Sequence, residues 1–218
     1  MERILNRTAV MPMPANGDLI YPLAKRILDF VISAAALVAL FPLFLVIAFL
    51  VKLDGGPIFY RQTRIGKNGR RFTFHKFRSM IPDADRHRAK LMAQTGAANG
   101  VLFKMKKDPR VTTVGQVLRK YSLDELPQLW NVMVGDMSLV GPRPALPSEV
   151  DTYTPEHHQR LQVEQGLTCF WQVSGRSDLN FEQQVALDLD YIAKASLLTD
   201  LQLLFRTIPA VLGGKGAY

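Results

Sequence analysis

One long apolar segment constrains the fold of this chain more than any other feature of its sequence. The run from Phe30 to Val51 reads FVISAAALVALFPLFLVIAFLV, carries no charge, and has Ser33 as its only polar side chain. A helix needs about 20 apolar residues to cross the hydrocarbon core of a bilayer. A buried helix of a soluble protein is rarely so long and so uniformly apolar. The segment therefore predicts a helix that enters a membrane.

Two details of this segment argue against a simple membrane span. Pro42 lies in its middle, and a proline removes a backbone hydrogen bond and kinks a helix. Both flanks are basic, with Lys25 and Arg26 before the segment and Lys52 after it. Because basic flanks favour the cytoplasmic side, a re-entrant helix hairpin broken at Pro42 satisfies both observations. Prolines are also tolerated within membrane spans, so the residues alone leave a single span open.

The net charge of +8 is concentrated in one stretch of the sequence. Between Gly55 and Pro82 there are seven basic residues and no acidic one, which leaves 20 of the 27 basic residues against 19 acidic ones elsewhere. The seven are Arg61, Arg64, Lys67, Arg70, Arg71, Lys76 and Arg78. Such a patch either meets nucleic acid, anionic lipid or a phosphorylated substrate, or forms a solvated face. A single cysteine, Cys169, excludes a disulfide framework and a cysteine-based zinc site.

The 218 residues fit one ordinary domain, and their pattern predicts an α+β, mostly helical fold. We expect residues 1–22 to form a mobile N-terminal segment, 23–53 the re-entrant membrane helix, and 54–218 a small cytoplasmic domain with short strands and membrane-surface helices. Aromatic, β-prone runs at 58–60 and 72–74 flank a glycine-containing turn and predict a hairpin. Helices are predicted at 83–92, 111–120, 126–134, 181–195 and 197–212, a loop at 94–100, and a strand at 170–173.

Candidate chemistry centres on two adjacent acidic residues, Asp124 and Glu125. The spacing of Ser122 and Glu125 resembles a capping box, and Pro127 favours an early helical position, so one interpretation is simply a helix start. The other is a carboxylate pair at the positive end of a helix. The field there would keep Asp124 ionised, as a nucleophile or a magnesium ligand must be.

Cations elsewhere in the chain complement these carboxylates. The rigid run Gly141-Pro142-Arg143-Pro144 presents one arginine, and Lys76 and Arg78 add two further cations. A guanidinium grips phosphate in a bidentate manner. Together with the apolar segment, these groups indicate phosphoryl transfer at a membrane. Asp188-Leu189-Asp190 matches the D-x-D pattern of metal-dependent nucleotide-sugar transferases. However, residues i and i+2 of a helix do not face together, which favours a chance match.

A series of motifs follows in order along the chain. They are Lys25-Arg26-x-x-Asp29, Phe59-Tyr60-Arg61-Gln62 with Arg64-Ile65-Gly66, Lys76-Phe77-Arg78-Ser79-Met80, Asp108-Pro109-Arg110-Val111-Thr112, Arg119-Lys120-x-Ser122-Leu123-Asp124-Glu125-Leu126-Pro127-Gln128-Leu129-x-Asn131, Ser138-Leu139-Val140-Gly141-Pro142-Arg143-Pro144, and Trp171-Gln172-x-Ser174-Gly175-Arg176. From Lys25 to Tyr218 the sequence resembles the bacterial sugar transferase family, the monotopic polyprenyl-phosphate phosphoglycosyl transferases. It is most similar to the short members that start exopolysaccharide repeat units.

This resemblance implies an activity. A sugar 1-phosphate, galactose or glucose, would move from a UDP-sugar to undecaprenyl phosphate with release of UMP, as the first membrane step of exopolysaccharide repeat-unit synthesis. Asp124 would attack the β-phosphate and form a covalent phosphosugar intermediate. Glu125 would assist, and both carboxylates would hold Mg²⁺. The family's apolar helix is re-entrant and breaks at a proline. The residues expected to bind substrate or its phosphates are Lys76, Arg78, Arg119, Arg143, Gln172 and Arg176.

The resemblance also implies partners and a location. We expect a UDP-sugar, undecaprenyl phosphate and lipid at the cytoplasmic face of the bacterial inner membrane, with a homodimer left open and nucleic acid not expected. The alternative is a catalytically inactive membrane-anchored scaffold of a polysaccharide assembly complex. The intact pair Asp124 and Glu125 argues against this alternative. Three positions depart from the family pattern. Phe41 precedes Pro42 where the family often has Ser, and Gln165 and Cys169 replace the Pro and Gly of P-G-L-T-G, which puts the rigidity of that loop in question.

Overall fold

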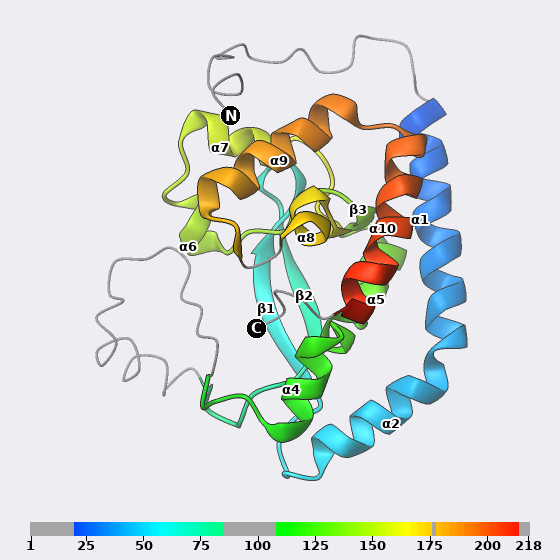
Figure 1. The fold of residues 1–218 in the computed structure, drawn as a ribbon, viewed down its shortest axis with the longest axis vertical. Helices are drawn as coiled ribbons and strands as arrows, with labels where there is room; N and C mark the ends of the chain where they lie inside the picture. Colours follow the sequence, from blue (N-terminus) through cyan, green and yellow to red (C-terminus); the bar gives the residue numbers. More distant parts are fainter. Residues whose placement is uncertain (1–19, 85–107, 176–177, 214–218) are drawn as a thin grey trace.

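A computed structural model describes residues 20–84, 108–175 and 178–213 (Figure 1). The described part is mostly helical with few strands, which confirms the predicted α+β class. Several predicted features lie outside the described residues: positions 1–19 of the N-terminal segment, most of the helix at 83–92, the loop at 94–100, and Arg176.

The apolar segment forms two helices, α1 (Ile20–Ala39) and α2 (Phe41–Lys52), which bend by 62° around Leu40. Pro42 lies in the first turn of α2, where its missing N–H removes no helical hydrogen bond. The predicted break at this proline is therefore confirmed. Within the described residues, no single helix is long and apolar enough to cross a membrane, whereas the bent pair taken together is. Figure 1 shows the pair along one edge of the protein.

Charged side chains hold the first turns of α1 to the rest of the protein. Lys25 is buried, and its Nζ donates to Asp200 Oδ2 at 2.8 Å and to the carbonyl of Val140 at 2.9 Å. The guanidinium of Arg26 donates to two carbonyls near the end of α5 (Gln128–Val134). These two cations therefore bind protein groups, although basic flanks of a membrane helix are expected to face lipid headgroups.

The predicted hairpin is confirmed. Strands β1 (Phe59–Ile65) and β2 (Arg71–Phe77) pair in antiparallel register, with Phe59 opposite Phe77. The turn between them includes the short 3-10 helix η1 (Lys67–Gly69). Phe72 and Phe74 of β2 are buried, so one face of the hairpin meets the core.

The remaining elements complete a mostly helical body. In chain order they are α4 (Thr113–Lys120), η2 (Leu123–Glu125), α5, β3 (Ser138–Val140), α6 (Pro147–Val150), α7 (Pro155–His158), η3 (Gln159–Leu161), β4 (Gly166–Thr168), α8 (Phe170–Ser174), α9 (Phe181–Lys194) and α10 (Leu197–Gly213). The helices predicted at 111–120, 126–134, 181–195 and 197–212 are confirmed with shifted ends. The strand predicted at 170–173 is wrong, because those residues form α8. The strand in this region is β4, which ends before them at Thr168. Packing partners decide between strand and helix in such a short aromatic run.

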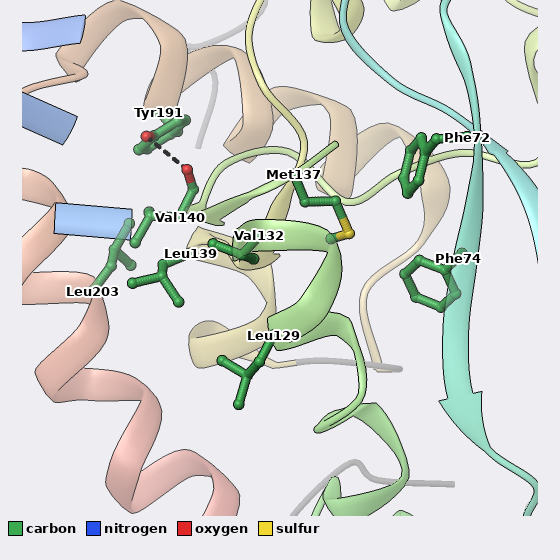
Figure 2. Close-up of a cluster of buried hydrophobic side chains, with 9 residues drawn as sticks. All are labelled: Phe72, Phe74, Leu129, Val132, Met137, Leu139, Val140, Tyr191 and Leu203. Atoms are coloured by element: carbon green, nitrogen blue, oxygen red, sulfur yellow. Dashed lines mark hydrogen bonds between the residues drawn. The ribbon is translucent and has the colours of Figure 1, made fainter. Parts of the chain in front are cut away.

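One core joins the hairpin to the C-terminal helices (Figure 2). Its buried side chains are Phe72, Phe74, Leu129, Val132, Met137, Leu139, Val140, Tyr191 and Leu203. A second cluster packs Ile47 and Val51 of α2 against Phe77 and Leu118. Since Leu37 of α1 packs on the first core and α2 on the second, both helices of the bent pair are fixed to the same domain.

Candidate active site

Asp124 and Glu125 lie in the 3-10 turn η2. Ser122, which precedes this turn, has a left-handed backbone with φ 52°, and its side chain makes no capping hydrogen bond. An N-cap needs an extended backbone, so the capping-box interpretation is wrong; α5 begins only at Gln128, after Pro127. The left-handed conformation costs a residue other than glycine about 1–2 kcal/mol. Such strain is often found at functional sites.

Two cations from distant parts of the chain converge on Glu125. Lys76, near the end of β2, places its Nζ 2.5 Å from Glu125 Oε1 and 3.9 Å from Asp124 Oδ2. Arg143 places its Nη1 3.4 Å from the same Glu125 oxygen. Its guanidinium also lies 5.9 Å from the centre of the Trp171 ring. The structure thus brings together four of the residues predicted to form the site.

The two carboxylates differ in their electrostatic surroundings. Burial raises the pKa of Asp124 above its usual range, and the charges of Lys76 and Arg119 oppose this rise only in part. Burial acts on Glu125 as well, but the charges of Lys76 and Arg143 outweigh it and lower the pKa of Glu125 to about 2. The charges of Lys76 and Arg119 therefore favour the ionised form of Asp124 against the effect of burial.

A parallel pair of short strands holds the loop at 141–144 that carries Arg143. Strands β3 and β4 pair side by side, the N–H of Gly141 donates to the carbonyl of Thr168 at 3.0 Å, and the N–H of Gly166 donates to the carbonyl of Pro142 at 2.8 Å. A Cβ at Gly166 would lie 2.1 Å from the backbone nitrogen of Gly141. Only glycine fits at this crossing, so the two segments lie in direct backbone contact.

Two of the departures from the family pattern, Gln165 and Cys169, are buried beside this strand pair. The Nε2 of Gln165 donates to the carbonyls of Arg160 at 2.9 Å and Val163 at 3.0 Å. The thiol of Cys169 donates to Oε1 of Gln172 at 3.2 Å. Gln172, predicted to bind substrate, thus lies on α8 against Cys169. Side-chain hydrogen bonds fix this loop in place of the absent proline and glycine.

The structure separates the other predicted phosphate-binding cations. Arg119 of α4 donates from Nε to Ser79 Oγ at 2.9 Å, and its charge reaches Asp124. Arg78, in contrast, is buried, is paired with Asp54, and donates to three backbone carbonyls. Its guanidinium ties the end of α2 to the end of β2, so the structure does not place it with the dyad.

The D-x-D pattern does not form a joint site. Asp188 is buried and pairs with Arg160, with Nη2 2.6 Å from Oδ2. Asp190 is partly exposed and pairs with Lys194 one turn further on. Burial raises the pKa of Asp188 to about 6, and Arg160 opposes that rise. The two carboxylates have separate partners, as the helical spacing predicted.

A family model described as "Bacterial sugar transferase" matches residues 20–214. The chain belongs to this family. The exopolysaccharide production protein ExoY of Sinorhizobium fredii is 46% identical, with 97% of this chain and 96% of the relative covered. A UDP-glucose:undecaprenyl-phosphate glucose-1-phosphate transferase of Caulobacter vibrioides is 44% identical, with 90% and 72% covered. An undecaprenyl-phosphate galactose phosphotransferase of Salmonella typhimurium is 42% identical, with 89% of this chain but 41% of that longer protein covered.

Arg64 lies beside the site of this sugar transferase, although it was not among the residues predicted to bind substrate. Arg64 of β1 donates from Nη1 to the carbonyl of Pro144 at 3.1 Å, within the loop that carries Arg143. The sequence shows it as one of seven similar cations. Its position opposite Phe72 in the hairpin is the signal that distinguishes it, because paired residues share a face of the sheet.

The acidic pair provides the donors that Mg²⁺ uses in proteins. In the described part of the chain, no group of three or more His, Cys, Asp or Glu side chains could hold a metal ion. Mg²⁺ is usually bound by one or two carboxylates, and substrate phosphates and water supply the other ligands. Asp124 and Glu125 are adjacent hard oxygen donors next to two cations. These two carboxylates would be the residues to hold a magnesium ion, with phosphate and water oxygens as its further ligands.

Proposed function

We propose that this protein transfers a sugar 1-phosphate from a UDP-sugar to undecaprenyl phosphate and releases UMP. One observation carries the proposal: Lys76 and Arg143 converge on the adjacent carboxylates Asp124 and Glu125. The names of the Caulobacter and Salmonella relatives, which describe transfer of a sugar phosphate to undecaprenyl phosphate, support it. Those two names also make glucose and galactose the first sugars to test.

Asp124 is the nucleophile of the first displacement. Its carboxylate oxygen attacks the β-phosphorus, an aspartyl–phosphosugar bond forms, and the bond from that phosphorus to the bridging oxygen breaks, so UMP leaves. A phosphate oxygen of undecaprenyl phosphate then attacks the same phosphorus and breaks the aspartyl bond. The carboxylate is thereby regenerated. A covalent intermediate divides one difficult transfer into two easier ones.

The surrounding charges support both displacements. Lys76 favours the ionised form of Asp124 against the effect of burial. Lys76 and Arg143 neutralise phosphate oxygens where negative charge must be accommodated, and Glu125 holds both cations at the site. Mg²⁺, held by Asp124 and Glu125, supplies further charge neutralisation when it is bound. The side chains thus supply the nucleophile and two positive charges at the site.

The bent helix pair is the membrane element of this proposal. Outward side chains of α1 and α2 are large and apolar, with Val38 exposed by 78%, Phe41 by 59% and Phe49 by 65%. Because α1 and α2 both pack on one domain, the pair enters and leaves on the same side of the bilayer, as a re-entrant hairpin at the cytoplasmic face of the inner membrane. Phe205 of α10, 71% exposed, adds apolar surface suited to the headgroup boundary.

Thiol labelling tests this topology. Single cysteines introduced near Lys25 and Lys52 are labelled with a membrane-impermeant reagent in intact and in opened cells. The native Cys169 is buried and contributes little background. We expect both introduced thiols to react only in opened cells. Labelling of one of the two in intact cells would establish a span instead of a hairpin.

A UMP-release assay tests the activity. The purified protein is incubated with UDP-galactose, UDP-glucose and other UDP-sugars, with undecaprenyl phosphate and Mg²⁺. We expect UMP from at least one sugar, and a sugar-phosphate adduct on the protein when undecaprenyl phosphate is omitted. Asp124→Asn should abolish both. UMP release that survives this substitution would reject the nucleophile, and a folded wild type that is inactive on every UDP-sugar would favour the scaffold alternative.

A further inference from the structure

Arg64 is held between the hairpin and the loop at 141–144. Its Nη1 donates to the carbonyl of Pro144 at 3.1 Å, and its Nη2 donates to Oε1 of Gln62 at 3.1 Å. Its Nε is buried and finds no hydrogen-bond partner among the described residues. Arg64 as a residue is half-buried, and no carboxylate of the described residues forms an ion pair with it. A buried donor left unpaired on such an arginine is costly to keep for stability alone.

The same arginine also lies over the ring that supports Lys76. The guanidinium carbon of Arg64 is 5.3 Å from the centre of the Phe74 ring, and Lys76 Nζ is 5.4 Å from that centre. Arg64 thus touches both segments that bring a cation to Glu125: strand β2, which carries Lys76, and the loop that carries Arg143. The planar guanidinium therefore lies over the Phe74 ring of β2 with Nη1 on the carbonyl of Pro144, and Nη2 on Gln62 of its own strand holds it there, so its rigid geometry fixes the distance between β2 and the loop.

The charge of Arg64 adds to the positive potential of the site. Burial and the nearby charge of Arg143 lower the pKa of Arg64 to about 10, so it remains a cation at neutral pH. Two guanidinium groups held near each other repel unless an anion accompanies them. Glu125 and Glu149 partly supply negative charge, and the pyrophosphate of a nucleotide sugar would supply more.

We propose that Arg64 is a positioning residue that holds the carbonyl of Pro144 and thereby aims Arg143 at the substrate's pyrophosphate. This inference rests on the proposed transferase activity. It rests on the two hydrogen bonds of Arg64 to protein oxygens and assigns this residue no direct contact with substrate. If Arg64 acts through Arg143, its removal has no further effect once Arg143 is gone.

A double-mutant cycle tests this dependence. The kcat/KM for UMP release is measured for Arg64→Met, Arg143→Met and the double variant, with Arg61→Met as the matched control on the exposed face of the same strand. We expect Arg64→Met to lower kcat/KM by up to about 10²-fold, as misplacement of a catalytic group does. The double variant should be no slower than Arg143→Met alone, and Arg61→Met should match the wild type. Losses that multiply in the double variant would contradict the proposal, since independent sites add in free energy.

A conservative variant separates geometry from charge. Arg64→Lys keeps the positive charge but cannot donate to both Gln62 and Pro144 with a rigid fork. We expect it to stay at least about 10-fold below the wild type. Full activity of Arg64→Lys would show that charge alone suffices and would overturn the positioning role. An active wild type with an unaffected Arg64→Met rejects only this inference, whereas an inactive wild type rejects the transferase activity itself.

Discussion

The charged cluster beneath α1 and the cluster around Glu125 both join cations to carboxylates but differ in how far these charges are buried. The anchoring cluster consists of Lys25, Tyr191 and Asp200, and the reaction cluster of Lys76, Asp124, Glu125 and Arg143. Within the first, the Lys25 and Asp200 side chains are 11% and 1% exposed, and Lys25 also donates to Tyr191 and the carbonyl of Val140. Within the second, the Lys76 and Arg143 side chains are 18% and 29% exposed.

This difference separates structural from reactive charge. A cation whose donors all end on buried protein acceptors has no capacity for a ligand, whereas cations that remain accessible can exchange a carboxylate for a phosphate. The clusters are nevertheless joined through β3. Lys25 holds the carbonyl of Val140, and Asp29 accepts from the N–H of Leu139 at 2.9 Å. The next residue, Gly141, begins the loop that carries Arg143, so the anchor of α1 also holds the base of the reactive loop.

Removing the charge of the anchoring cluster should have the largest effect on stability. Lys25→Met leaves Asp200 buried without its cation, and breaking a buried pair from one side costs about 3–5 kcal/mol of unfolding free energy. Denaturant unfolding in detergent measures the change. Lys52→Met is the matched control at the other flank, where the lysine is exposed, and it should stay within about 0.5 kcal/mol of the wild type. Equal stability of the Lys25→Met and Lys52→Met variants would show that Lys25 does not anchor α1 more strongly than an exposed flanking lysine.

Removing a cation of the reaction cluster should affect rate more than stability, because Arg143 still pairs with Glu125. Lys76→Met deletes the group nearest to Glu125 Oε1, and losing one preorganised electrostatic contact lowers kcat by about 10²–10³-fold. UMP release and thermal unfolding are measured on the same preparation. A variant that unfolds easily but retains its turnover per folded molecule would place Lys76 with the anchoring cluster.

The Lys76→Met substitution should also shift the pH dependence of UMP release in one direction. Burial raises the pKa of Asp124, and Lys76 opposes that rise. Without Lys76 the pKa rises further, so Asp124 loses the charge that a nucleophile needs at a higher pH than in the wild type. The acid limb of the UMP-release profile should therefore move to higher pH in Lys76→Met. An acid limb that stays in place or moves to lower pH would show that Lys76 does not control this ionisation.

Arg78 lies only two residues after Lys76, but its donors end on protein acceptors. Arg78→Met leaves three backbone carbonyls and Asp54 without their donor. Unpaired buried acceptors cost about 1–3 kcal/mol, and we expect a loss of stability in that range. Turnover per folded molecule should stay within a few-fold of the wild type. A large loss of turnover at unchanged stability would return Arg78 to the phosphate-binding residues that its motif suggested.

Local pattern was enough to predict some parts of this molecule. Proline within an apolar run fixed the break near Leu40, and alternating aromatic runs gave the hairpin. The roles of Lys25 and Arg78 could not be predicted, because their partners Asp200 and Asp54 are found only through the tertiary fold. Strands β3 and β4, of three residues each, are too short for periodicity to show them. Motif resemblance located the acidic pair, but its 3-10 turn depends on one left-handed residue that no pattern revealed.

The smallest effect is expected for the exposed half of the D-x-D pattern. Asp190 pairs with Lys194 one turn away on the surface of α9, with both side chains well exposed, and such pairs contribute about 0.3–0.5 kcal/mol. Asp190→Asn should therefore change unfolding free energy by no more than about 0.5 kcal/mol and leave both UMP release and its magnesium dependence unchanged. If Asp190→Asn abolished activity, the pattern would be a metal site despite its separate partners. Unchanged activity would show that a charged motif predicts a catalytic role only where the fold leaves its charged groups free to bind a ligand. Lys25 and Arg78 show the same for cations, because protein groups occupy their donors.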